Sequence, residues 1–306
     1  MGPAEQSGLV SARVEALLGA RVAAVGRVPG SVENRNYRAR TDIGDVFVKT
    51  GPGAAMRLED HVCALLPGLH INGPRVLARE YDGPLGTGVL VIGCLPGADA
   101  GSEPATPTAL RDAGRQVRRL HEVTAPGFGQ ARLSAAGHLE GELPDWSGVI
   151  ETAIADLPPL VEHDVIAATF AAEIRGAIEA NRALTVYDGR GRLLHDDLKA
   201  GHVFTHNGEL SGIIDWGDPF IGDPLFDLAP LTRTAGEFDD FFAGYGMTLD
   251  DSVRRRLTAY RVIRDVLTLH FEWAAGGDWF AVYRDRIGVD LERLGASPGP
   301  SRLSRT

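Results

Sequence analysis

The chain has 306 residues, 44% of them hydrophobic and 24% charged, which is typical of a globular protein and argues against collagen-like, coiled-coil and disordered chains. This length is enough for two lobes, each with its own core. The formal net charge of -10 argues against a broad nucleic-acid-binding surface. It would suit a cationic small substrate, although many cytosolic enzymes are equally acidic.

Cysteine usage and hydropathy bear on location. Cys63 and Cys94 lack the spacing of metal ligands, and we expect two free thiols in a reducing compartment. The first ten residues contain no long apolar run, and no window approaches the ~20 apolar residues that a membrane span needs. We therefore expect a cytoplasmic protein with no nucleic-acid or membrane partner, and the sequence leaves the oligomeric state open.

The first third of the chain combines two expected helices with short strands. Helical spacing of apolar residues over 8–18 is ended by Gly19, and residues 22–28 are rich in valine. A second helix is expected over 54–66, and a Gly-containing linker between two strands favours a hairpin. The expected strands cover residues 36–41, 46–50, 74–77 and 88–92.

The rest of the chain is expected to be mainly helical, with a loop and two short strands over 193–215. The expected helices cover residues 110–122, 148–157, 165–178 and 238–294. Glycine and proline between the two parts indicate a boundary, because these residues end strands and set turns. The expected organisation is an N-lobe over 1–93, a hinge over 94–97, a C-lobe over 98–296 and a flexible tail over 297–306.

The most informative stretch runs from His195 to Phe204, and Asp215 follows it after a short interval. Phosphoryl transfer needs a carboxylate to orient the acceptor hydroxyl, a divalent metal on the phosphates and cations to neutralise charge. Asp197 is placed to be the catalytic carboxylate. Asp215 and His202 could hold the metal, because carboxylate oxygen and neutral imidazole both serve as ligands. Lys199 could face the transferred phosphate.

This run resembles the catalytic loop of the aminoglycoside phosphotransferase and choline kinase superfamily, distant relatives of the protein kinases. The superfamily pattern is His-x-Asp, four residues, then Asn, which corresponds here to His195, Asp197 and, at the Asn position, His202. Asp215 matches the metal-binding aspartate of the superfamily. Residues 222–229, Gly-Asp-Pro-Leu-Phe-Asp-Leu-Ala, resemble a segment that buttresses the loop in these enzymes.

The resemblance implies an α+β, bilobal, protein-kinase-like fold, with a small antiparallel-sheet N-lobe and a larger, mainly helical C-lobe. It also implies Mg²⁺, ATP or GTP as co-substrate, and a small hydroxylated acceptor. Side chains at the hinge cannot choose between the two nucleotides, because backbone groups of Ile92 and Cys94 would bind the purine.

The superfamily carries a strand lysine paired with a helix glutamate, and Lys49 fits that strand. Glu59 is its expected partner, because it shares a helix face with Met56 and Cys63 that should be buried. Asp60, the next residue, should point elsewhere. Residues 30–37 would form the phosphate-covering loop, or an ordinary hairpin turn. In that loop, Ser31 and Asn34 are the side chains that could approach phosphates.

Two positions depart from the superfamily pattern. His202 replaces the usual Asn and is a softer ligand than an amide oxygen, which bears on the metal geometry. Asp196 stands where antibiotic kinases usually have Gly, and we expect a solvent-facing loop acid there. For Lys199, a phosphate contact and a solvated side chain remain equally open.

The sequence leaves several functions in competition. The first is a kinase that modifies an aminoglycoside, a macrolide or a related antibiotic. The second is a metabolic kinase acting on choline, an amino alcohol or a sugar. A third is a nucleotide-binding protein without catalysis, which the presence of Lys49, Asp197 and Asp215 disfavours. A metal hydrolase using His195, Asp197 and His202 would need a further set of ligands with recognised spacing, which the sequence does not show.

Overall fold

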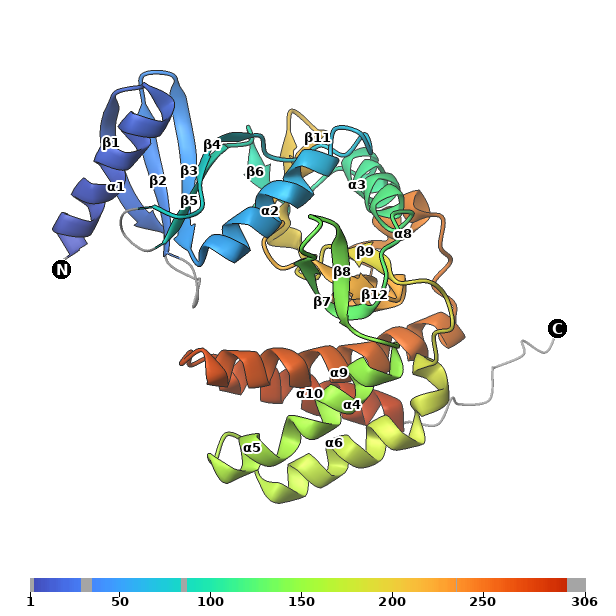
Figure 1. The fold of residues 1–306 in the computed structure, drawn as a ribbon. Coiled ribbons are helices and arrows are strands. Elements are labelled where there is room, and N and C mark those ends of the chain that lie inside the picture. The colour runs from blue at the N-terminus through green and yellow to red at the C-terminus, as the bar shows by residue number, and fades with distance from the viewer. Residues whose placement is uncertain (1–2, 29–34, 84–86, 235, 296–306) are drawn as a thin grey trace.

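The structure is a computed structural model that describes residues 3–28, 35–83, 87–234 and 236–295. An antiparallel sheet forms its N-terminal part, and helices dominate its C-terminal part (Figure 1). This confirms the expected α+β, bilobal, kinase-like fold. None of the described helices has both the length and the apolar character to cross a membrane.

The N-terminal sheet has five antiparallel strands in the order β1-β2-β3-β5-β4. Side chains alternate between its two faces, as the two-residue period of a strand requires. Val46 and Val48 face helix α1 (Pro3–Leu18), whereas Leu90 and Ile92 join Met56 on the other face. The strands are β1 (Val22–Val28), β2 (Arg35–Thr41), β3 (Gly44–Gly51), β4 (Val76–Glu80) and β5 (Gly88–Gly93).

Helix α2 (Gly53–Leu65) connects the two parts of the molecule. Met56 packs in the small core under the sheet, whereas Leu58 and Val62 belong to the large core of the C-terminal part. The segment after α2 is tied to the C-terminal part as well, since the Asn72 backbone carbonyl accepts from Ile213 N at 2.9 Å. The 94–97 hinge, which stays a proposal, is therefore not the only connection between the two parts.

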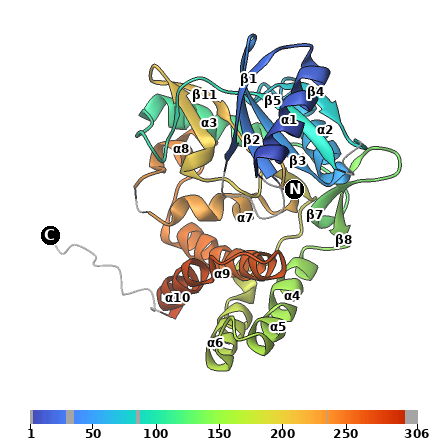
Figure 2. The ribbon, with the colours of Figure 1, turned by 90° about the vertical axis from the view of Figure 1, so that its left-hand side faces the viewer.

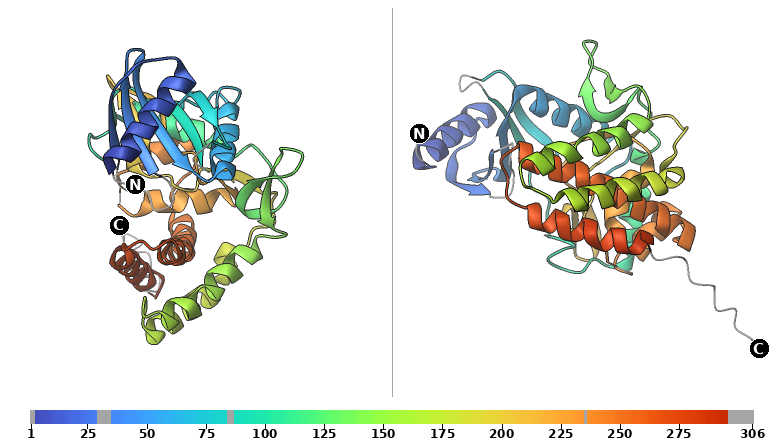
Figure 3. Two further views of the ribbon diagram at one scale, coloured as in Figure 1. Left: turned by 60° about the vertical axis from the view of Figure 1, so that its left-hand side comes forward. Right: turned by 90° about the horizontal axis from the view of Figure 1, so that it is seen from below.

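Helix α9 contacts α4, α5, α6, α7 and α10, and α3 packs against α8. Figure 2 shows α7 between the N-terminal sheet and α9, and Figure 3, from below, shows α4 to α6 alongside α9 and α10. Asp250 caps α9 by accepting from Val253 N, which satisfies a free amide of its first turn. The helices are α3 (Pro107–Leu120), α4 (Ser147–Ala155), α5 (Leu157–Glu162), α6 (Ala168–Ala180), α7 (Pro224–Leu228), α8 (Asp239–Tyr245), α9 (Asp251–Ala274) and α10 (Phe280–Gly295).

Two small sheets lie between the helices, in the strand orders β8-β7-β12-β9 and β11-β10-β6. The hairpin of β7 and β8, the strand β12 and the short helix α5 were not expected from the sequence. The strand expected over 74–77 starts later, at Val76, because Pro74 cannot donate to a ladder. The strands are β6 (Ala98–Asp99), β7 (Phe128–Leu133), β8 (Leu139–Leu143), β9 (Arg192–Leu194), β10 (Val203–His206), β11 (Glu209–Ile213) and β12 (Phe220–Gly222).

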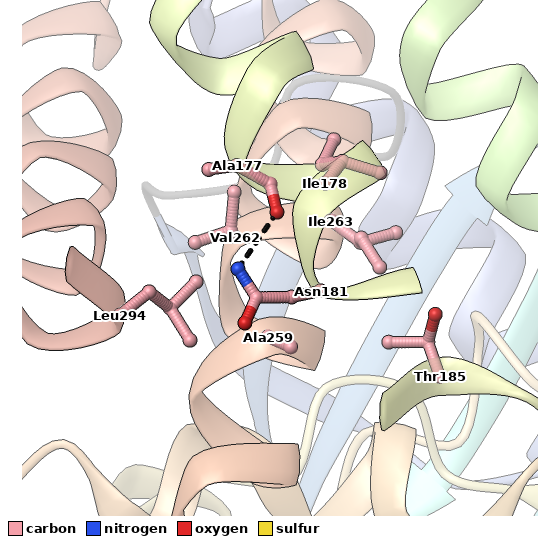
Figure 4. A pocket seen from close by; sticks show the side chains of 8 residues that line it. All are labelled: Ala177, Ile178, Asn181, Thr185, Ala259, Val262, Ile263 and Leu294. Carbon is pink, nitrogen blue, oxygen red and sulfur yellow. Dashed lines mark hydrogen bonds between the residues drawn. The ribbon is translucent and has the colours of Figure 1, made fainter. Parts of the chain in front are cut away.

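A tight apolar seam joins α6, α9 and α10 (Figure 4), and it leaves no space for a water molecule. The one side-chain amide in it, that of Asn181, donates to the Ala177 carbonyl at 2.9 Å and so is satisfied locally. The seam is therefore packing between helices and not a ligand site. Its lining is Ala177, Ile178, Asn181, Thr185, Ala259, Val262, Ile263 and Leu294.

Candidate active site

The loop from His195 to His202 joins β9 to β10 and is fixed by a buried histidine. Nε2–H of His195 donates to the Ile214 carbonyl at 2.8 Å, so Nδ1 is free to accept from Asp197 N at 3.2 Å. Its ring lies 4.6 Å from that of Trp216. One side chain thus links the expected catalytic loop to the segment that carries Asp215.

Asp227 on α7 supports the same loop through hydrogen bonds to its backbone. Its carboxylate accepts from the backbone amides of His195 (2.9 Å) and Asp196 (2.8 Å), and from Nε2 of His121 (2.9 Å). Burial opposes ionisation, but the hydrogen bond from His121 and nearby positive charge lower the pKa of Asp227 to about 2. The 222–229 segment therefore has the buttressing position that the resemblance implied.

The loop brings Asp197 and His202 to Asp215, which lies just beyond β11 with a left-handed backbone (φ 68°). Among the described residues, these three form a group whose potential ligand atoms all lie within 4.8 Å of one another. His202 Nδ1 donates to the Asp197 carbonyl at 2.8 Å, which leaves Nε2 facing Asp215 Oδ2 at 3.5 Å.

The protonation of His202 makes this group a fit for a cation. Burial lowers the pKa of His202 to about 4, although the Asp197 and Asp215 carboxylates oppose the shift. A neutral ring with its proton on Nδ1 places the Nε2 lone pair against a carboxylate oxygen, two acceptors with no donor between them. A divalent cation on both atoms would resolve this repulsion, and oxygen with imidazole is a suitable ligand set.

Lys49 and Glu59 form the ion pair that the sequence predicts. Lys49 Nζ lies 2.7 Å from Glu59 Oε1 and 2.7 Å from Asp215 Oδ1, and the Lys49 side chain is only 7% exposed. Burial would lower the pKa of Lys49, but the two carboxylates raise it above its ordinary value, so the ammonium stays charged. The same ammonium lowers the pKa of Asp215 against the effect of burial. Asp60 points away and binds Arg79.

The remaining predicted residues fall into three groups. Lys199 is half-exposed, and its Nζ lies 2.7 Å from Asp197 Oδ2. The sequence contains no lysine besides Lys49 and Lys199, and each of them binds a carboxylate of the cluster. Ile92 lies in β5, between β3 and β4, with its side chain buried, and Cys94 directly follows β5. The predicted loop residues, Ser31 and Asn34, lie outside the described residues.

Asp196 corrects one expectation. Instead of facing solvent, its carboxylate forms an ion pair with Arg264 of α9, and the side chain is 19% exposed. Its backbone has φ 64°, in the left-handed region that favours residues without a Cβ. Arg264 was not singled out from the sequence. It lies 68 residues from Asp196, and no local pattern reports a contact of that range.

Fold and site together define the class of kinase-like phosphotransferases. The chain belongs to the phosphotransferase enzyme family (APH), whose family model matches residues 25–264, and this confirms the resemblance seen in the catalytic loop. No curated protein sequence matches the chain significantly.

Solved structures share the fold at low sequence identity. A thermostable mutant of the aminoglycoside phosphotransferase APH(4)-Ia, in its apo form, matches with a TM-score of 0.75 and 18% identity over 94% of this chain and 100% of that one. A putative fructosamine-3-kinase from Thermobifida fusca YX-ER1 matches with a TM-score of 0.68 and 18% identity over 94% and 99% of the two chains. The macrolide 2'-phosphotransferase MphH from Brachybacterium faecium matches with a TM-score of 0.60 and 16% identity over 97% and 100%.

Proposed function

We propose that the protein transfers the γ-phosphoryl group of ATP or GTP to a hydroxyl of a small molecule. The observation that carries this proposal is the arrangement of Asp197 beside the Asp215–His202 pair, with the Lys49–Glu59 ion pair behind it. Such transfer depends mainly on positioning and on charge stabilisation, and this arrangement contains a group for each task.

Asp197 is the proposed catalytic carboxylate, which orients the acceptor hydroxyl and takes its proton late in the transfer. Its side chain is 41% exposed, so an acceptor can reach it, and Lys199 lies close enough to contact the transferred phosphoryl group. A hydrogen bond from the acceptor hydroxyl to the Asp197 carboxylate suffices to align the hydroxyl.

On the nucleotide side, Lys49 is the proposed cation for the earlier phosphates, and Glu59 holds it in place. Oε2 of Glu59 is buried without a hydrogen-bond partner among the described residues, and a Cβ on Gly217 would lie 3.1 Å from it. The glycine therefore leaves this ion pair the room it needs. Backbone groups of Ile92 and Cys94, with Ser31 and Asn34 of the covering loop, complete the proposed nucleotide site.

Mg²⁺ is the metal that the family implies, and Asp215 and His202 are the residues that would hold it. When bound, the ion neutralises charge on the phosphates and holds them for transfer. The ligand set fits, because Asp215 supplies carboxylate oxygen and His202 a neutral imidazole nitrogen on the side away from its Nδ1 hydrogen bond.

For the acceptor, we propose an antibiotic such as an aminoglycoside or a macrolide. Support comes from the similar structures: one APH(4)-Ia complex contains ADP and hygromycin B, and a spectinomycin phosphotransferase (TM-score 0.64, 14% identity) was solved with ADP and its antibiotic. The putative fructosamine-3-kinase is as similar in identity as apo APH(4)-Ia, which keeps a metabolic kinase as the second candidate.

Coupled release of nucleoside diphosphate tests the proposal. Purified protein with Mg²⁺ and either ATP or GTP should be given aminoglycosides, macrolides, peptide antibiotics, choline, amino alcohols and glycated amines. We expect release that depends on one acceptor class and disappears in Asp197→Ala. Tight nucleotide binding without release for any acceptor would favour a non-catalytic relative, and no binding of either nucleotide would contradict the proposal.

A further inference from the structure

The catalytic loop contains a turn that its own residues do not favour. Asp196 has a left-handed backbone with φ 64°, directly before Asp197. Side chains with a Cβ adopt this conformation rarely, although Asp tolerates it better than most. Something beyond the residue itself must therefore hold the turn. The amide of Asp196 donates to Asp227 Oδ1 at 2.8 Å, which fixes the backbone side of the turn.

The side-chain side of the turn is held by α9. The Arg264 guanidinium forms an ion pair with the Asp196 carboxylate, and both side chains are mostly buried, at 12% and 19% exposure. The same guanidinium lies over the Phe226 ring, with its Cζ 5.3 Å from the centroid. Phe226 immediately precedes Asp227 on α7. Arg264 thus contacts the loop and the helix that buttresses it.

We propose that Asp196 and Arg264 are positioning residues, whose ion pair holds the turn that presents Asp197 to the acceptor and fixes the loop to α9. This inference rests on the proposed phosphotransferase function. Solvent screens a pair this buried only weakly, and removing one partner leaves the other desolvated without its counter-charge. Each single substitution should therefore lower kcat more than the replacement of both residues does.

Three variants test the pair through turnover. Asp196→Gly removes the carboxylate and leaves a residue that suits the left-handed backbone, and Arg264→Met removes the charge at similar length. We expect each to lower kcat by about 10- to 100-fold, the scale on which small misplacement of reacting groups acts, with the nucleotide Kd unchanged. Because no charge is then left without its partner, Asp196→Gly combined with Arg264→Met should be slower than wild type but faster than either single variant, and Arg264→Lys should recover part of kcat.

Arg261→Met is the matched control, because Arg261 lies one helical turn from Arg264 on α9 and pairs with Asp290 (2.6 Å), not with the loop. It should lower the melting temperature without changing kcat per folded molecule. Equal losses of kcat in Arg261→Met and Arg264→Met would assign the effect to overall stability and overturn the proposal.

Hydrogen–deuterium exchange of the apoprotein tests the loop without any acceptor. Peptides covering His195 to His202 should exchange faster in Arg264→Met than in wild type, and unchanged in Arg261→Met. If the wild type turns over no acceptor, the proposed function fails and this comparison alone decides whether the pair holds the loop. Equal loop exchange in wild type and Arg264→Met would overturn the proposal, as would faster exchange with an unchanged kcat in an active enzyme.

Discussion

Nε2 of His202 faces Oδ2 of Asp215 at 3.5 Å, with the only ring proton of His202 committed to the Asp197 carbonyl on its other nitrogen. The usual residue of the superfamily at position 202 is asparagine, which would present an amide oxygen to the metal. The hydrogen bond from Nδ1 selects the tautomer whose Nε2 lone pair points to the Asp215 carboxylate, which is the orientation that the proposed metal ligand would need.

His202→Asn should therefore keep the protein active and change its choice of metal. Asn supplies an oxygen ligand, so we expect nucleotide binding with Mg²⁺ to be kept, and the relative affinity for softer ions such as Co²⁺ and Zn²⁺ to fall. Titration of a fluorescent nucleotide with each ion, after removal of metals by chelation, measures this. An unchanged order of metal preference would show that position 202 is not a ligand.

Asp215→Ala should abolish metal-dependent nucleotide binding, since it removes the carboxylate that both His202 and Lys49 face. The apparent nucleotide affinity of the variant should no longer respond to added Mg²⁺. Asp188→Ala serves as the control, because Asp188 is an exposed carboxylate on another loop. A Mg²⁺ response as large as that of the wild type would remove Asp215 from the metal site.

The two lysines of the chain can be compared directly, because one belongs to the proposed nucleotide site and the other to the catalytic loop. Lys49→Ala should weaken nucleotide binding by about 10- to 100-fold, the range expected when a charged hydrogen-bonding partner is lost. Lys199→Ala is its matched control for binding, and should lower kcat only if Lys199 contacts the transferred phosphoryl group. Isothermal titration with ADP and steady-state rates give both numbers. Equal nucleotide affinity in the wild type and Lys49→Ala would contradict the role of Lys49.

The lowered pKa of Asp227 predicts that the free energy of unfolding decreases in acid. Its pKa is lowered to about 2 in the folded protein, so its ionised form contributes stability above the ordinary carboxyl pKa of 3.8. That contribution, about 2 kcal/mol at neutral pH, is lost as the pH falls from about 4 towards 2. The difference in unfolding free energy between wild type and Asp227→Asn should therefore shrink over this range. Denaturant unfolding at several pH values measures it, with Asp188→Asn as the exposed control.

A difference that stays constant between neutral and acid pH would show that the ionised state of Asp227 is not what supports the loop. In that case the cost of Asp227→Asn would come only from its amide group, which places donors opposite the backbone amides of His195 and Asp196.

The Lys49–Glu59 contact was predictable from the sequence because each step is local. A charged residue at the end of an apolar strand needs a partner, and helical periodicity places Glu59 on the face of Met56 and Cys63. The strands around Lys49 were predictable as well, because the alternation of their side chains determines which face is buried. The order of motifs then indicates the family without any knowledge of long-range contacts.

The Asp196–Arg264 contact could not be predicted in this way. Local polarity suggests a solvent-facing acid, and only the packing of α9 against the loop gives the carboxylate its partner. The β7–β8 hairpin was missed for a related reason. Its strands are short, and β7 also pairs with β12, which is distant in the sequence and which no local pattern reports.

The most direct test of the account follows labelled γ-phosphate from the nucleotide to the acceptor, in wild type and in Asp197→Ala, with both substrates saturating. We predict a labelled acceptor in the wild type and a rate about 10²- to 10⁴-fold lower in the variant, the usual contribution of a positioned acid or base. The nucleotide Kd should be the same in both proteins. Transfer at the wild-type rate in Asp197→Ala would contradict the assignment of Asp197 as the catalytic carboxylate.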